Sequence, residues 1–231
     1  DYMKRRKLLL AFLLSFMLMG IFPTYVHADT DPVDEKDIIY FIMIDRFNDG
    51  DPSNNYTANK ADLKSWHGGD LQGIIDKLDY IKGLGATAIW ITPVQAQDVG
   101  GYHGYWAVDF KSVDKHFGTM EKYRELVKKA HEKGINVIQD IVMNHTGVLH
   151  PWVNDPAYTG WFHEGGSISN WNDPREVENL RLAGLPDLAQ ENPEARKYLI
   201  DMAKWWIQET GIDGFRLDTV RHVPKDFWVE F

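Results

Sequence analysis

The sequence predicts an α/β protein built around a mainly parallel β-sheet. Three observations carry this prediction: short apolar runs, longer segments with helical spacing between them, and polar residues where the runs end. The runs span residues 38–44, 86–92, 135–142 and 212–218, and the helical segments span 70–82, 119–133 and 193–210. Strands that are apolar almost throughout are typical of parallel sheets covered on both faces. Two architectures fit, an open doubly wound sheet and a (β/α)8 barrel.

The first run, IIYFIMI at 38–44, is too short for a free helix and indicates a buried strand. The segment DLQGIIDKLDYIK at 70–82 then repeats its apolar residues with helical spacing, which predicts an amphipathic helix. Its apolar stripe consists of Leu71, Ile74, Ile75, Leu78 and Ile81. Gly83 and Gly85 follow and end the helix.

The later elements continue the alternation. The second run, ATAIWIT, is a buried strand that stops at Pro93, and the second amphipathic helix stops before Gly134. The run INVIQDIV predicts the third strand and IDGFRLD the fourth, with the third helix between them.

The interval between the third strand and the third helix, residues 146–190, is unusually long. It contains three tryptophans, several glycines and little periodicity. A loop of this length in a compact domain is usually functional or a small inserted domain. We therefore predict an inserted domain over 146–190, between the two parts of the main domain at 29–145 and 191–231.

The N-terminal segment has the form of a bacterial-type secretory signal peptide. Four basic residues (KRRK) precede the apolar stretch LLLAFLLSFMLMGIF, and a small-residue site ends at Ala28. A membrane anchor usually needs about 20 apolar residues, more than this stretch offers. We therefore expect a signal peptide at 1–28, and a secreted, extracellular protein without stable membrane association after cleavage.

The two ends of the chain do not look natural. Asp1 and Tyr2 precede the first methionine, Met3, and the last residue, Phe231, lies within the hydrophobic segment DFWVEF. We therefore expect a partial reading frame.

Charge and cysteine content bear on the class of protein. Cleavage after Ala28 would remove four of the 25 Lys and Arg residues and one of the 34 Asp and Glu residues, which changes the net charge from −9 to −12. Nucleic-acid binding is not expected, because phosphate neutralisation needs clustered basic residues. The chain has no cysteine, so an exported form depends on a large core or on bound metal instead of disulfides. We expect a monomer.

Charged residues lie in the fourth predicted strand and just after it, in GFRLDTVRH at 214–222. Because alternate residues of a strand face the same way, Arg216 and Asp218 point together. An arginine close to a carboxylate lowers its pKa and keeps it ionised, as a nucleophile must be. The pair could equally be a structural ion pair that locks the strand end.

Polar and aromatic residues follow two other strands. The third predicted strand ends in DIVMNH, with Asn144 and His145 just past its end. The loop after the second strand contains YHGYW at 102–106, a combination of rings on which sugars stack. Packing explains any one of these residues equally well, but several polar strand ends at one edge of a parallel sheet favour a site.

The loop after the first strand is rich in oxygen ligands. It reads DRFNDGDPSNN at 45–55 and is followed by WHGGD at 66–70. Calcium takes about six to eight such oxygens at a time. An Asx-rich turn is the alternative, and the spacing is not that of an EF-hand.

Together these stretches resemble the α-amylase family of glycoside hydrolases. DIVMNH is similar to the family's first signature, GFRLDTVRH to its second, and LPDL at 185–188 to the short signature near the end of its inserted domain. The likeness runs from about Ile38 to the last residue. It implies a (β/α)8 barrel, truncated after about the fourth strand, with an insertion after the third. It also implies calcium-dependent retaining hydrolysis of α-1,4-glucosidic bonds in starch and related glucans.

The resemblance implies roles for individual residues. Asp218 would be the nucleophile, and Arg216 would hold it ionised. Sugar would contact His103, Tyr105 and His145 where the bond breaks, and Arg221 and His222 on the leaving-group side. Asp140 would support the structure and take no part in catalysis.

Two calcium ions are also implied. The first would bind Asn144, Asp187 and the backbone carbonyl of His222. The second, typical of the branch that contains the cyclodextrin glucanotransferases, would bind Asp49, Asp51, Asn54, Asn55, Asp70 and the carbonyl of Gly68.

A retaining glycosidase needs two carboxyl groups about 5 Å apart. In this family the acid/base glutamate and a third carboxylate follow later strands, so we expect both beyond Phe231 and predict that the chain alone is inactive. A cyclodextrin glucanotransferase or maltogenic amylase is the alternative with the same chemistry. A non-catalytic sugar-binding relative is the alternative from a different class.

Overall fold

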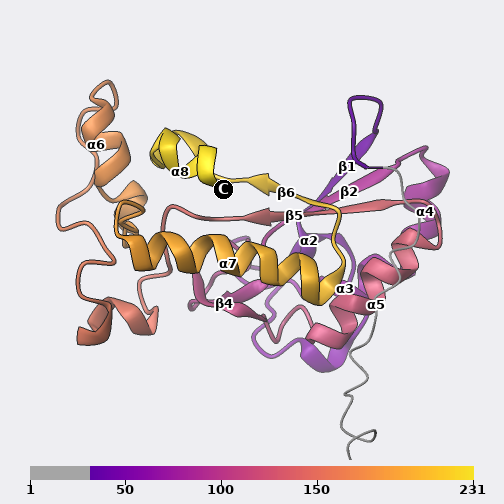
Figure 1. Ribbon diagram of the computed structural model, residues 1–231. Coiled ribbons are helices and arrows are strands. Elements are labelled where there is room, and N and C mark those ends of the chain that lie inside the picture. The colour runs from indigo at the N-terminus through magenta and orange to yellow at the C-terminus, as the bar shows by residue number, and fades with distance from the viewer. Residues whose placement is uncertain (1–31) are drawn as a thin grey trace, which may run out of the picture.

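A computed structural model describes residues 32–231, so the predicted signal peptide lies outside the described residues. At its centre is a four-stranded parallel sheet (Figure 1). The strands are β1 (Ile39–Ile42), β2 (Ala88–Ile91), β5 (Asn136–Ile141) and β6 (Gly214–Leu217), which lie in the sheet in chain order. Each falls within one of the predicted apolar runs, so the prediction of a parallel α/β fold is confirmed.

Amphipathic helices connect the strands. They are α3 (Leu71–Asp76), α4 (Leu78–Gly83), α5 (Met120–His131) and α7 (Pro193–Thr210). Thr119 caps α5 by accepting a hydrogen bond from the N–H of Lys122. Gly211 ends α7 at a φ of 74°, a left-handed conformation that glycine adopts easily. In Figure 1, α3, α5 and α7 lie along one side of the sheet.

The predicted helix over 70–82 is two helices. Lys77 leaves the helical conformation at φ −108° and ψ 6°, and its N–H donates to the carbonyl of Ile74, which tightens the last turn of α3. The break could not be foreseen from periodicity, because the apolar stripe continues across it: Leu71, Ile74, Leu78 and Ile81 are all fully buried.

Two further elements differ from the expectation. The first strand ends at Ile42, and Ile44, predicted to be extended, begins the short helix α2 (Ile44–Phe47). An antiparallel hairpin of β3 (Gln95–Gln97) and β4 (Ala107–Val113) follows β2 and was not predicted. Its pairing shifts register twice, which removes the regular alternation that identifies a strand in sequence.

The segment 146–190 consists of short helical turns and irregular backbone. These are η2 (Pro151–Asn154), η3 (Pro156–Tyr158), α6 (Pro174–Asn179) and η4 (Leu182–Gly184). Outside the segment, the remaining short elements are η1 (Pro52–Asn54), η5 (Val220–His222) and α8 (Lys225–Glu230). The boundaries of the inserted domain stay a prediction.

The carboxyl end of β6 points toward the side of the molecule where α6 lies (Figure 1). The hydrophobic core fills the space between the sheet and the helices, and Trp206 on α7 donates its indole N–H to the carbonyl of Phe110 on β4 at 2.9 Å. Within residues 32–231, none of the helices has the length and apolarity that a membrane crossing requires.

Candidate active site

A cluster of charged residues lies where β5 and β6 run side by side. Asp140 and Arg216 are partners in the register of these two parallel strands. Arg216 Nη1 lies 3.1 Å from Oδ2 of Asp140 and donates to Oδ1 of Asp218 at 2.6 Å. The predicted pairing of Arg216 with Asp218 is therefore present, and a second carboxylate shares the same guanidinium nitrogen.

Asp140 is enclosed by donors. Its side chain is fully buried, and its Oδ2 accepts hydrogen bonds from the Tyr105 hydroxyl at 2.8 Å and the Trp90 indole N–H at 3.1 Å. Burial raises the pKa of Asp140 to about 6, although the Tyr105 hydrogen bond and the charge of Arg216 act in the opposite direction. An acid with such a pKa would suit proton transfer, but full burial keeps a substrate oxygen out of its reach.

Asp218 is the accessible partner of Arg216, with 17% of its side chain exposed. Its N–H donates to the carbonyl of Ile141 at 3.0 Å, which continues the ladder between β6 and β5 by one residue. Thr219 then takes a φ of 50°, an uncommon conformation for a β-branched residue. Such strain is concentrated at functional sites. Here it turns the chain out of the sheet directly after Asp218.

The residues predicted to bind sugar meet around Tyr105. His103 Nδ1 accepts the N–H of Tyr105 at 3.0 Å, and His145 Nε2 lies 3.1 Å from the Tyr105 carbonyl oxygen. Burial lowers the pKa of His145 to about 4, and burial with the charge of Arg46 lowers the pKa of His103. Both imidazoles are therefore neutral near pH 7. His145 is buried, and its Nδ1 also lies 3.2 Å from Nδ2 of Asn144, so a sugar hydroxyl would have to replace one of its two present partners.

Arg221 and His222 make their contacts with the segment 146–190. Arg221 donates to the carbonyl of Trp171, and His222 Nδ1 lies 2.9 Å from the carbonyl oxygen of Val177. The Trp171 ring meets the His222 ring edge-on at 5.9 Å and is 48% exposed. His222 therefore joins η5 to α6, and Arg221 joins η5 to the chain just before α6.

The first predicted calcium site has two unpartnered oxygens. Within the described residues, Oδ1 of Asn144 and Oδ1 of Asp187 are buried without a hydrogen-bond donor. The other Asp187 oxygen pairs with His163 Nδ1 at 2.6 Å. Unpaired buried oxygens are costly unless a ligand binds them, and an amide oxygen with a carboxylate suits a hard cation such as calcium. The residues present therefore fit the ion.

The second predicted site fits in part. Asp49, Asn54 and Asn55 each have a buried Oδ1 without a donor in the described chain. A Cβ on Gly68 would lie 2.3 Å from Oδ1 of Asn55, so glycine leaves the space in front of that oxygen open. Carboxylate and amide oxygens around such a space are ligands that calcium takes.

Asp51 and Asp70 already have partners in this loop. Asp51 Oδ1 accepts the N–H and hydroxyl of Ser53, at 3.0 and 2.6 Å. Asp70 caps α3 by accepting the N–H of Gly73 at 2.6 Å, and its other oxygen accepts the N–H of Asp51 at 2.8 Å. From residue 32 to residue 231, no three His, Cys, Asp or Glu side chains form a metal site by themselves. Amide and carbonyl oxygens would have to complete either site.

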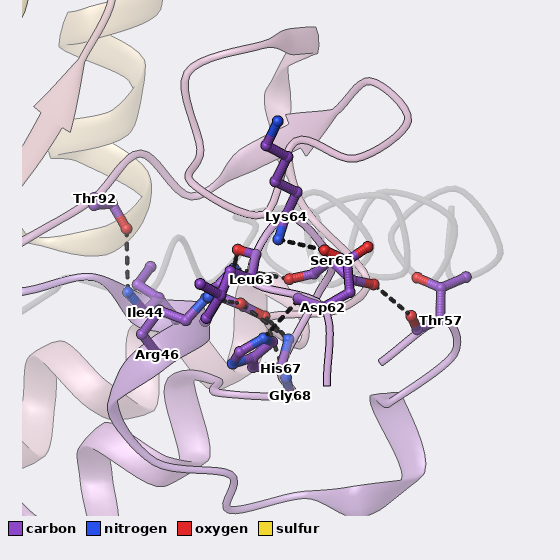
Figure 2. Close-up of polar contacts among 11 residues, drawn as sticks. Ile44, Arg46, Thr57, Asp62, Leu63, Lys64, Ser65, His67, Gly68 and Thr92 are labelled. Carbon is purple, nitrogen blue, oxygen red and sulfur yellow. Dashed lines mark hydrogen bonds and ion pairs between the residues drawn. The ribbon is translucent and has the colours of Figure 1, made fainter. Parts of the chain in front are cut away.

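Two residues around the candidate active site, Trp90 and Arg46, were not singled out from the sequence. Trp90 donates to Asp140, and its ring lies 4.9 Å from the Arg216 guanidinium carbon. Arg46 contacts the Tyr102 ring. It also donates to two carbonyls of the loop at 57–68 (Figure 2). Strand alternation could have placed Trp90 on a face of β2, but its partners depend on the register with β5, which the sequence does not show.

Among known protein families, the one described as alpha amylase, catalytic domain, matches residues 41–229 of this chain. A β/α-amylase of Paenibacillus polymyxa is 50% identical over 222 residues, which cover 90% of this chain and 18% of that protein. A cyclomaltodextrin glucanotransferase of Klebsiella oxytoca is 40% identical and is matched over 83% of this chain and 34% of its own length.

Solved structures are similar as well. An Anoxybacillus α-amylase matches with a TM-score of 0.83 and 63% identity, over 84% of this chain and 43% of that one. A Geobacillus thermoleovorans α-amylase, solved with acarbose, matches with a TM-score of 0.80 and 57% identity, over 84% and 42%.

Fold, site and likeness together place this chain among the glycoside hydrolases. Within them it belongs to the α-amylase family, and its parallel sheet is part of the (β/α)8 barrel. The chain spans less than half the length of each of these four relatives.

Proposed function

We propose that this chain is part of a secreted, calcium-dependent, retaining enzyme that hydrolyses α-1,4-glucosidic bonds in starch and related glucans. The hydrogen bond from Arg216 to the accessible carboxylate of Asp218, at 2.6 Å, is the observation that carries the proposal. The Anoxybacillus and Geobacillus relatives, both α-amylases, support it.

Asp218 is the nucleophile in this proposal. One of its oxygens attacks the anomeric carbon, the glycosidic C–O bond breaks, and an acid/base carboxyl group protonates the leaving oxygen. Water then hydrolyses the glycosyl ester. Arg216 holds the carboxylate of the nucleophile in place through its hydrogen bond to Oδ1. Asp140 is not the acid/base, because its side chain is buried and held by Tyr105, Trp90 and Arg216.

The sugar at the cleavage point stacks on the Tyr105 ring and forms hydrogen bonds with His103 and His145. Tyr105 is half-buried and held through its hydroxyl by Asp140, so the position of its ring is set before substrate binds. Such preorganisation lowers the entropic cost of binding. Arg221 and His222, which contact the segment 146–190, serve the leaving-group side.

Calcium would bind to Asn144, Asp187 and the carbonyl of His222, and a second ion to the loop at 49–70. A bound divalent ion would neutralise carboxylates and hold the segment 146–190 against the strand ends. The unpartnered oxygens of Asn144 and Asp187 support the first site, and those of Asp49, Asn54 and Asn55 support the second.

A cyclodextrin glucanotransferase or maltogenic amylase is the second candidate, supported by the Klebsiella relative. Both would use the same nucleophile, and the glucanotransferase would pass the glycosyl group to a sugar hydroxyl instead of water. Either enzyme would be an extracellular monomer. Product analysis after incubation with starch separates the candidates, because a glucanotransferase accumulates cyclic dextrins and a maltogenic amylase accumulates maltose.

The nucleophile is tested with 5-fluoro-α-glucosyl fluoride, a slowly turned-over donor that traps a glycosyl-enzyme ester. The full-length protein is incubated with it, digested and examined by mass spectrometry. We expect the added mass on the peptide that contains Asp218 and none in Asp218→Asn. A label on another carboxylate, in protein that hydrolyses starch, would contradict the assignment.

A further inference from the structure

Arg46 lies between two loops that border the proposed site. It follows β1 on the short helix α2, and 23% of its side chain is exposed. Nη2 donates to the carbonyls of Leu63 and Ser65, at 3.0 and 2.8 Å. Figure 2 shows this side chain beside the labelled residues of the loop at 57–68.

The neighbouring Asp45 also binds the loop at 57–68 and holds Arg46 against it. Its side chain is fully buried, accepts the N–H groups of His67 and Gly68 at 2.9 and 3.2 Å, and binds Nε of Arg46 at 2.7 Å. Charge-assisted hydrogen bonds of this kind are stronger than neutral ones. The guanidinium is thereby held in one orientation against the loop at 57–68.

The guanidinium also contacts the aromatic loop. Its central carbon lies 4.1 Å from the centroid of the Tyr102 ring, well inside the range of a cation–π contact. Tyr102 meets the ring of His103 edge-on at 5.1 Å. His103 in turn accepts the N–H of Tyr105 at 3.0 Å. Arg46 is thus connected through Tyr102 to two of the residues proposed to bind sugar.

We propose that Arg46 is a positioning residue. It anchors Tyr102 to the loop at 57–68 and so presents His103 and Tyr105 to the sugar. The inference rests on the proposed function, because it gives these two residues a ligand. Neutralising the buried Asp45 requires a cation, but it does not require contact with Tyr102. The ring contact is what distinguishes positioning from a structural role.

The test uses Arg46→Met, Tyr102→Leu and their double variant in the full-length protein. KM and kcat are measured on maltoheptaose, and amide hydrogen exchange is measured in the peptide that covers 99–106. We expect KM to rise about three- to tenfold in each single variant, the size of a lost cation–π contact, with kcat within about twofold. The KM of the double variant should not exceed the higher of the two single-variant KM values, because the two substitutions remove the same contact.

Arg46→Lys is the rescue variant. Lysine keeps a cation near the Tyr102 ring but lacks the planar fork that binds two carbonyls and Asp45 together. We expect its KM to lie between those of the wild type and Arg46→Met. Lys111→Met is the matched control, because Lys111 has a cation–ring contact of 5.2 Å with Tyr198, which is not among the proposed site residues. It should change neither KM nor exchange at 99–106.

A purely structural role for Arg46 predicts a different result. A smaller folded fraction lowers the apparent kcat and leaves KM unchanged, so that outcome would overturn the proposal. Effects of Arg46→Met and Tyr102→Leu that multiply in the double variant would also overturn it. Hydrogen exchange needs no substrate: faster exchange at 99–106 in both single variants supports the anchor even if α-glucan hydrolysis fails, and unchanged exchange refutes it.

Discussion

Arg216 and Asp140 are register partners on neighbouring strands, and Nη1 of Arg216 lies 3.1 Å from Oδ2 of Asp140. The same nitrogen donates to Asp218 at 2.6 Å. One guanidinium group therefore joins a buried carboxylate to an accessible one. In the proposed enzyme, the buried partner holds the arginine in place and the accessible partner performs the chemistry.

Replacing Arg216 tests this arrangement. We expect Arg216→Gln to lower kcat of the full-length protein on soluble starch by about 100-fold or more, the usual scale for losing electrostatic stabilisation in an active site. Arg175→Gln is the control, because Arg175 is 89% exposed and pairs with Asp173 at the surface. A variant of Arg216 with near wild-type kcat would show that its pairing with Asp218 is only structural.

Adding a methyl group at Gly68 tests the second metal loop. Gly68 has a φ of 90°, and a Cβ there would lie 2.3 Å from Oδ1 of Asn55. We expect Gly68→Ala to cost about 1–3 kcal/mol of unfolding free energy, through backbone strain and displacement of Asn55. Urea denaturation measures the change. Gly166→Ala is the matched control, since a Cβ at Gly166 meets nothing within 4 Å. An equal loss of unfolding free energy in that variant would contradict the reasoning.

Chelation tests the calcium proposal. We expect EGTA to lower the melting temperature of the full-length protein by about 5 °C or more, because an ion that binds only the folded state stabilises it. Added calcium should restore the melting temperature. Asn144→Leu and Asn55→Leu remove one unpartnered oxygen from each site, so each should shrink the EGTA effect. An unchanged melting temperature after chelation would refute both sites.

His150 makes stability depend on pH. Burial lowers its pKa from 6.5 to about 4, and its Nδ1 accepts the N–H of Trp152 at 3.2 Å. A depressed pKa in the folded state means that the contribution to stability is present above pH 6.5 and is lost as the pH falls toward 4. The loss is at most about 3 kcal/mol.

The variant His150→Gln keeps a hydrogen-bond acceptor and cannot titrate. We expect the unfolding free energy of the wild type to fall more steeply than that of the variant between pH 7.5 and pH 4.5, both chosen to bracket the pKa of histidine at about 6.5. Parallel pH profiles for the two proteins would show that His150 titrates normally.

Much of the fold could be predicted because its signals are local. An apolar run of the right length indicates a buried strand wherever it stands, and the four runs all became strands of one sheet. The break at Lys77 was missed because the stripe on either side of it faces the same core. The β3–β4 hairpin was missed because its register shifts remove alternation.

By itself the sequence determined the order of the four strands of the main sheet, the family, and the presence of Arg216 and Asp218 at a strand end. Each depends on periodicity or on motifs within a few residues. Only the tertiary structure decided that Asp140 is enclosed while Asp218 is accessible, and that Arg46 reaches Tyr102. Asp140 and Arg216 are 76 residues apart, and only strand register and packing bring such residues together.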